Sequence, residues 1–211
     1  MFQHLSPEQV CLSIAIVAYS LAAIAAWAAV LTRRRQDSIV TIATSLAVAA
    51  CLLSIALRWQ QTGNGPFLTM YEVLLSNLFS LGFIFIVIYI TVPRARPASL
   101  LVLPLLSLLG WWTFDADPEP LELPATYDTA LLWIHVGVGK VFLGMNLVAV
   151  GLAGLIFLRQ LNRNLFPVNA VSADDELDEL AWRFMAVAFV FHSLMLIAGA
   201  VWAQDAWGRF W

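Results

Sequence analysis

Charged residues are scarce in this chain. Asp, Glu, Lys and Arg make up 12% of its 211 residues, about half of the roughly 25% that is usual in soluble domains. Hydrophobic residues reach 61%, and the mean hydropathy is +0.82. This composition excludes a soluble globular enzyme and a disordered chain. The formal net charge of −3 offers no electrostatic basis for binding nucleic acid.

Cysteine is almost absent. Cys11 and Cys51 stand alone in apolar stretches, without CxxC spacing. This excludes a disulfide-rich secreted module, and we interpret both residues as small buried hydrophobic side chains. The sequence also lacks internal repeats, glycine-rich phosphate loops and nucleophile motifs.

Long apolar stretches are what the sequence has instead. A helix that crosses the hydrocarbon core of a bilayer needs about 20 apolar residues, and six stretches approach this length. We therefore predict an all-α polytopic membrane bundle, with 1–211 as a single transmembrane domain. We expect the first stretch to be a retained helix and not a signal peptide, because its basic residues follow it and no clean small-residue cleavage site ends it. The predicted helices cover residues 10–31, 38–57, 70–92, 97–112, 129–158 and 182–203.

The arginines predict how the bundle is oriented. Cytoplasmic loops carry an excess of Lys and Arg, and eight arginines fall on one side of the predicted helices. Both chain termini, with the acidic loop 113–128, are then expected on the outer, periplasmic side. Five acids in 174–179 fit the start of the sixth helix, where they complement its dipole. The eight residues are Arg33, Arg34, Arg35, Arg94, Arg96, Arg159, Arg163 and Arg183.

Besides Arg183 at the start of the sixth helix, His135, Lys140, His192 and Glu72 lie inside the predicted helices, where ionisable groups are costly and usually functional. His135 is either a metal or haem ligand reachable from outside, or an interfacial histidine bonded to a neighbouring helix. We expect Lys140 to form a buried ion pair with Glu72. His192 could ligate haem, relay protons, or hydrogen-bond across helices.

Most tryptophans fall towards the predicted outer face. An ordinary aromatic belt marks both interfaces, so this bias favours a flat aromatic surface for a planar apolar ligand such as a porphyrin. A belt that is uneven by chance is the alternative. Trp27 and Trp182 belong to the inner side, whereas the outer group comprises Trp59, Trp111, Trp112, Trp133, Trp202, Trp207 and Trp211.

Three collinear segments resemble the cytochrome c assembly family, which comprises the CcsA/ResC proteins and, more distantly, CcmC. They read RWQQTGNGPFLTMYEVLLSNLF, LLWIHVGVGKVFLG and LDELAWRFMAVAFVFHSLMLIAGAVWAQDAWGRFW. In that family the last segment opens into a tryptophan-rich WWD segment outside the membrane. Family members hold haem there and present it for covalent attachment to the CxxCH motif of apocytochrome c.

The resemblance implies a set of haem-binding residues. His135 matches the first outer histidine of the family, an axial ligand of the haem b iron. Trp202, Trp207, Gly208 and Trp211 match the start of the WWD segment. His192 has no counterpart in the family and stays a second candidate ligand of the iron.

The chain departs from the family pattern at its end. It stops at Trp211, before the rest of the WWD segment, two further helices and the second outer histidine. Either the sequence is shorter than the gene product, or this is a reduced relative that has lost the chemistry. Whether the protein is an enzyme is therefore left open.

The resemblance also implies partners and a location. The partners are apocytochrome c or other assembly subunits of the CcsB/ResB type, besides membrane lipid; the acidic outer loop could receive a basic partner. The location is a bacterial plasma membrane or a thylakoid membrane. Two other functions remain: a structural or assembly subunit of a respiratory or photosynthetic membrane complex, and a transporter or proton pathway through Glu72, Lys140 and His192.

Overall fold

The computed structural model describes residues 6–34, 36–63, 65, 67–122, 124–127, 129–162 and 173–210, and every structural statement below refers to these residues. They form helices and connecting segments, with no β-strand among them. Six helical spans are long and apolar enough to cross a membrane. The predicted all-α membrane bundle is therefore confirmed.

Each predicted helix is present, with shifted ends. Ser6 caps the first helix and Thr69 caps the third, each in a capping box that satisfies free backbone N–H groups of the first turn. The elements are α1 (Pro7–Thr32), α2 (Asp37–Thr62), α3 (Met70–Thr91), the 3₁₀ helix η1 (Pro93–Ala98), α4 (Ser99–Asp115), the 3₁₀ helix η2 (Ala125–Tyr127), α5 (Ala130–Leu161) and α6 (Asp174–Trp207).

Two helices extend well beyond their predicted apolar stretches. α2 continues to Thr62 because Arg58, which the hydropathy pattern placed beyond its end, is buried and paired inside the protein. α6 begins at Asp174 because the acidic residues there form its first turns, where carboxylates interact favourably with the helix dipole. Hydropathy alone ended both helices at their charged residues.

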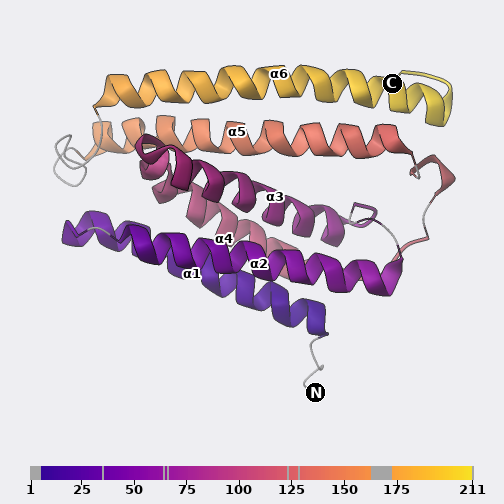
Figure 1. Cartoon of the computed structure of the whole chain (residues 1–211), viewed down its shortest axis with the longest axis horizontal. Coiled ribbons are helices and arrows are strands. Elements are labelled where there is room, and N and C mark those ends of the chain that lie inside the picture. Colours follow the sequence, from indigo (N-terminus) through magenta and orange to yellow (C-terminus); the bar gives the residue numbers. More distant parts are fainter. Residues whose placement is uncertain are drawn as a thin grey trace.

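The helices are arranged in pairs (Figure 1). α5 and α6 lie side by side as an antiparallel hairpin along one edge of the molecule, and α1 and α2 pack together at the opposite edge. α3 and α4 lie between these pairs. α6 packs mainly on α5, so most of its length is left exposed.

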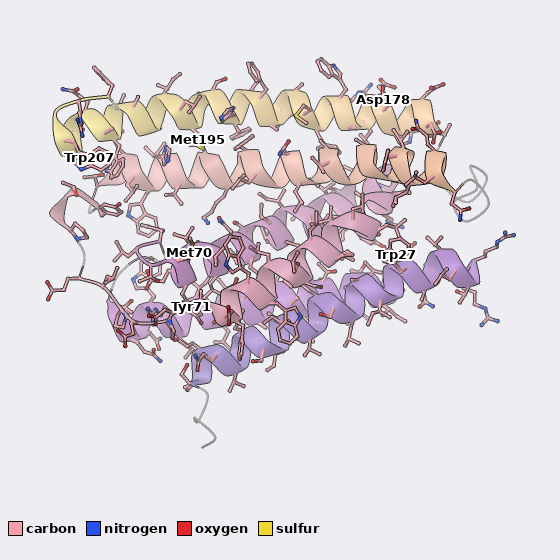
Figure 2. The ribbon with its side chains drawn as sticks, turned by 180° about the vertical axis from the view of Figure 1, so that it is seen from behind. Trp27, Met70, Tyr71, Asp178, Met195 and Trp207 are labelled. Carbon is pink, nitrogen blue, oxygen red and sulfur yellow. The ribbon has the colours of Figure 1, made fainter. Side chains whose placement is uncertain are left out.

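Tryptophan and arginine separate to opposite ends of the bundle. Successive helices are antiparallel, so the starts of α1, α3 and α5 share one end with the ends of α2, α4 and α6. We call this the tryptophan-rich end; it holds Trp59, Trp111, Trp112, Trp133, Trp202 and Trp207. The arginine-rich end holds Arg33, Arg34, Arg94, Arg96, Arg159 and Arg183. Figure 2 shows Trp207 towards the first end, and Trp27 and Asp178 towards the second. The expected Trp211, Arg35 and Arg163 lie outside the described residues.

Small residues let the helices approach closely. The Tyr19 hydroxyl donates a hydrogen bond to the Leu78 carbonyl of α3 at 3.2 Å. A Cβ atom on Gly82 would lie 1.7 Å from that hydroxyl oxygen, so this crossing of α1 and α3 requires glycine. Cys51 is fully buried in the same core, and Cys11 is half-buried; both are free thiols. The interpretation of Cys51 as a core residue is confirmed.

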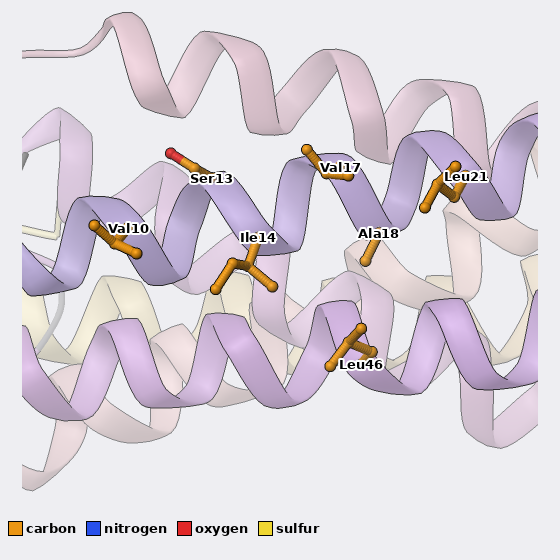
Figure 3. Close-up of a pocket in the computed structure, with 7 residues that line it drawn as sticks. All are labelled: Val10, Ser13, Ile14, Val17, Ala18, Leu21 and Leu46. Carbon is orange, nitrogen blue, oxygen red and sulfur yellow. The ribbon is translucent and has the colours of Figure 1, made fainter.

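An apolar groove runs along the outside of α1 and α2 (Figure 3). Its lining contains a single polar side chain, Ser13, whose hydroxyl donates to the Gln9 carbonyl of its own helix. A groove with no free polar group at membrane depth suits lipid acyl chains, and we do not place the functional site there. It is lined by Val10, Ser13, Ile14, Val17, Ala18, Leu21 and Leu46.

Candidate functional site

His135 lies at the seam between α5 and α6, near the tryptophan-rich end. Its Nδ1 atom is 2.8 Å from the Met195 carbonyl oxygen of α6. A carbonyl oxygen can only accept, so Nδ1 carries the proton and donates it. In the neutral imidazole with this tautomer, the other ring nitrogen, Nε2, is an acceptor, and it has no hydrogen-bond partner among the described residues. This is the protonation pattern of a histidine that ligates a metal, in which a second partner fixes the tautomer.

Glycine on α6 makes room for the imidazole. A Cβ atom on Gly199 would lie 2.6 Å from His135 Nδ1, closer than real Cβ atoms come. On α5, a Cβ atom on Gly139 would similarly lie 2.9 Å from the Met195 sulfur. The two glycines therefore set the close contact of α5 and α6 that holds His135 in place. The interhelical hydrogen bond that one interpretation of His135 predicted is present, and it is compatible with metal ligation.

The tryptophans near the end of α6 play different parts. Trp202 is 9% exposed, and its Nε1 donates to the Thr126 carbonyl oxygen at 2.9 Å. Its ring packs edge-on against Tyr127 of η2 and against Trp207. Trp207, by contrast, is 55% exposed. Trp202 thus anchors the segment before α5, and Trp207 presents an open aromatic face.

Gly208 ends α6 in the left-handed conformation. Its φ is +70°, its N–H donates to the Gln204 carbonyl oxygen at 2.9 Å, and a Cβ atom there would meet nothing within 4 Å. Gly208 therefore turns the chain just after the exposed Trp207, as a C′ glycine does. Trp211, the last predicted aromatic residue of the site, is outside the described residues.

His192 lies deeper along the same hairpin. Its ring stacks on Phe142 of α5, with ring centroids 4.5 Å apart and planes inclined by 19°. The structure therefore does not bring His192 to His135, and it shows a ring stack where hydrogen bonding across helices was one expectation. The described residues contain no cluster of three or more His, Cys, Asp or Glu that could hold a metal ion.

A second aromatic cluster covers the other side of α5. Trp59 and Trp133 stack with centroids 5.7 Å apart, and Phe67 packs edge-on against Trp133. Gly65 lets the connecting segment lie against these rings, because a Cβ atom there would come within 2.8 Å of Phe67. Trp59 and Trp133 remain 44% and 42% exposed, so aromatic surface flanks both sides of the α5 start.

The predicted ion pair of Lys140 with Glu72 is wrong. The Glu72 carboxylate instead accepts from Arg58 Nε at 3.0 Å, and from the backbone N–H groups of Leu68 and Thr69. The prediction failed because hydropathy placed Arg58 outside α2, so Arg58 was not considered as a partner of Glu72. Tertiary packing decides the partner, since the guanidinium reaches Glu72 from the last turns of α2.

Arg58 is the centre of a buried charge cluster that sequence analysis missed. Arg58, Glu72 and Glu8 are 4%, 2% and 3% exposed. Arg58 Nη1 lies 3.5 Å from a Glu8 carboxylate oxygen, and the guanidinium lies over the Tyr71 ring. The cluster joins α1, α2 and α3 at the tryptophan-rich end. The sequence did contain a signal for this cluster. Glu8 follows the cap residue Ser6 by two positions, and Arg58 and Glu72 both lie near the outer ends of their predicted helices.

Lys140 reaches α3 instead of a carboxylate. Its Nζ donates to Ser76 Oγ and to Asn77 Oδ1, each at 2.9 Å. Lys140, Glu72 and His192 thus have separate partners, and they do not contact one another among the described residues. The contacts that a proton pathway through these three residues would need are absent there.

Comparison with known proteins identifies the family. The family model described as cytochrome C assembly protein matches residues 75–211, more than half of the chain. The chain belongs to the cytochrome c assembly protein family. The matched region includes His135, both histidine-bearing helices and the whole end of α6. No solved structure matches the chain.

Relatives in this family carry the name cytochrome c biogenesis protein CcsA. The chain is 26% identical over 209 residues to that of Prochlorococcus marinus strain AS9601, covering 85% of this chain and 66% of the relative. It is 28% identical over 200 residues to that of Synechococcus sp. strain CC9902 (79% and 64%), and 23% identical over 166 residues to that of Chlamydomonas reinhardtii (76% and 47%). The chain thus spans about two thirds or less of the length of these relatives.

Proposed function

We propose that this protein binds haem b at the tryptophan-rich end and presents it for cytochrome c maturation. The observation that carries the proposal is the His135 imidazole, which the Met195 carbonyl holds with Nε2 free to ligate iron. Neutral imidazole is a common axial ligand of haem iron. The printed function of the CcsA relatives, cytochrome c biogenesis, supports the same activity.

The residues around His135 would then have different roles in binding haem. Gly199 and the Met195 carbonyl fix the imidazole, and the exposed Trp207 offers a face on which a porphyrin ring can stack. Trp202 contributes by holding η2 and Trp207 in place. Gly208 ends α6 directly after Trp207, and we include Trp211 in the haem-facing surface by its position in the sequence alone. Haem is cargo in this scheme, and its covalent attachment would take place on apocytochrome c.

The orientation follows from charge. The arginine-rich end is assigned to the cytoplasm, because Lys and Arg accumulate there in membrane proteins. The tryptophan-rich end, both termini and the acidic residues of 113–128 would then face the compartment that contains cytochromes c. A CcsB/ResB-like assembly subunit and apocytochrome c are the partners we propose. A bacterial plasma membrane and a thylakoid membrane both satisfy this arrangement.

Optical spectroscopy of the purified protein provides the experiment. The full chain, in neutral-lipid nanodiscs loaded with haem, should show a Soret band and sharp α and β bands on reduction. Haem content, measured as the pyridine haemochrome, should approach one per chain. We expect His135→Ala to lower haem retention at least tenfold, because it removes the proposed protein ligand of the iron.

His192→Ala is the matched control, because it removes a histidine from the same hairpin. It should retain haem at the wild-type level, since the His192 ring is stacked on Phe142. Equal haem retention by wild type and His135→Ala would refute the ligand assignment. A wild-type protein that binds no haem and copurifies with stoichiometric neighbours would favour the structural or assembly subunit instead.

A further inference from the structure

Lys140 is a cation with uncharged partners inside the bundle. Two of its three ammonium protons go to Ser76 Oγ and Asn77 Oδ1. No carboxylate of the described residues lies within 4 Å of it, and the third proton has no acceptor there. Glu72, the acidic residue one turn before Ser76 on α3, is occupied by Arg58.

The cluster lies below the surface of the membrane. Ser76 and Asn77 follow Met70, the first residue of α3, by six and seven residues, which places them about 10 Å along the helix axis. α3 has 22 residues, so it is about 33 Å long and roughly matches the hydrocarbon core. A cation at that depth is costly without a counter-ion, and membrane-embedded charges usually pair. The carboxylate of a ligand would supply such a counter-ion at Lys140.

Apolar surface continues from the cluster towards the middle of the bilayer. Phe79 and Phe83 lie three and seven residues after Ser76, on the same side of α3. Their rings are stacked, with centroids 6.0 Å apart, and Phe83 is 50% exposed. An amphiphile in a leaflet has its charged head towards the membrane surface and its apolar body towards the midplane. The order Lys140, Phe79, Phe83 has that polarity.

We propose that Lys140, Ser76 and Asn77 form a binding site for the carboxylate of a membrane-dissolved amphiphile. The ammonium neutralises the carboxylate and donates to it. The Asn77 side-chain N–H₂ is a further donor available to the bound carboxylate. The apolar body of the ligand lies along Phe79 and Phe83. A dicarboxylic porphyrin and a long-chain fatty acid both have this chemistry.

This site is separate from the one proposed for haem iron. His135 faces α6, whereas Lys140, five residues later on α5, faces α3. Five residues correspond to a rotation of about 140° around the helix. Binding at Lys140 therefore requires neither His135 nor iron, and the two proposals can fail independently.

Metal-free protoporphyrin IX is the probe, because it has two carboxylates and no iron for His135 to ligate. Its affinity for the full chain in phosphatidylcholine nanodiscs is measured by porphyrin fluorescence. We expect Lys140→Met to weaken binding about tenfold or more, as loss of a charged hydrogen-bond partner does. Lys140→Arg, which keeps the charge, should stay within about threefold of wild type.

Arg34→Met is the matched charge control. Arg34 is an exposed cation at the arginine-rich end, away from both proposed sites, so its removal should leave affinity unchanged. Should Lys140→Met fail to give a monodisperse protein, Lys140→Gln retains hydrogen bonding without charge and should show the same loss. Equal affinity of wild type and the folded neutral variant overturns the proposal, as does equal affinity for protoporphyrin and its dimethyl ester.

Palmitate identifies the source of the carboxylate. If palmitate displaces protoporphyrin from the wild type but not the residual protoporphyrin from Lys140→Met, the result supports a general carboxylate site that lipids can occupy. Retention of protoporphyrin at saturating palmitate, with Lys140 dependence intact, supports a porphyrin site. If wild type and Lys140→Met bind protoporphyrin with equal affinity and palmitate competes equally with both, the carboxylate site is refuted. This conclusion holds whatever the effect of His135→Ala on haem retention.

Discussion

Replacing Arg58 by methionine should destabilise the tryptophan-rich end more than any surface change. Methionine has a similar length but no charge, so Glu72 and Glu8 would remain buried without their cation. Removing one partner of a buried pair costs about 3–5 kcal/mol. For a chain of this length, 1 kcal/mol corresponds to about 2–4 °C in Tm. We therefore expect Tm to fall by about 6–20 °C.

The geometry also ranks the two carboxylates. Glu72 lies 3.0 Å from Arg58 Nε and accepts two backbone N–H groups, whereas Glu8 lies 3.5 Å from Nη1. Glu72→Gln should thus lower Tm more than Glu8→Gln. Thermal unfolding in detergent, followed by tryptophan fluorescence, gives the Tm of all three variants. The double variant Arg58→Met/Glu72→Gln should show a smaller decrease in Tm than the sum of the two single decreases. An Arg58→Met protein that unfolds within 2 °C (about 1 kcal/mol) of wild type would refute the reasoning.

Two further predictions concern packing and surface charge. Gly82→Ala should lower stability by about 1–3 kcal/mol, because its Cβ would lie 1.7 Å from the Tyr19 hydroxyl oxygen; adding Tyr19→Phe should recover part of the loss, and purely additive Tm changes would contradict this contact. Arg96→Met removes a partly exposed pair with Asp37 at 3.0 Å, so we expect a loss of about 1 kcal/mol or less; a loss comparable to that of Arg58→Met would show that burial does not separate the two pairs.

Much of the site was predictable because its residue types are rare here. His135 was singled out because few ionisable residues fall within the predicted helices. Its position between α5 and α6 agrees with an interfacial or a ligand role. Trp207 and Gly208 were found through the resemblance of the α6 end to the cytochrome c assembly family. Sequence could not separate Trp202 from Trp207, since only the contact with Thr126 shows which ring is buried and which is open.

Partner assignments were the least predictable feature. Glu72 was the only acidic residue and Lys140 the only lysine within the predicted helices, so pairing them was the natural hypothesis. The continuation of α2 through Arg58 brings a second cation to Glu72, and Lys140 is left with Ser76 and Asn77. A hydropathy pattern gives depth along a helix, but pairing also requires the rotation of each helix about its axis.

The sequence by itself determined the membrane location, the six helices and the separation of tryptophan from arginine, because these depend on segment length and on the free energy of placing each side chain in lipid or at its surface. Only the tertiary structure decided that His135 donates to Met195, that Arg58 pairs with Glu72, and that Lys140 donates to Ser76 and Asn77. Those three facts depend on which helix faces which. Side chains from different helices meet at distances of about 3 Å, and a small rotation of one helix would exchange their partners.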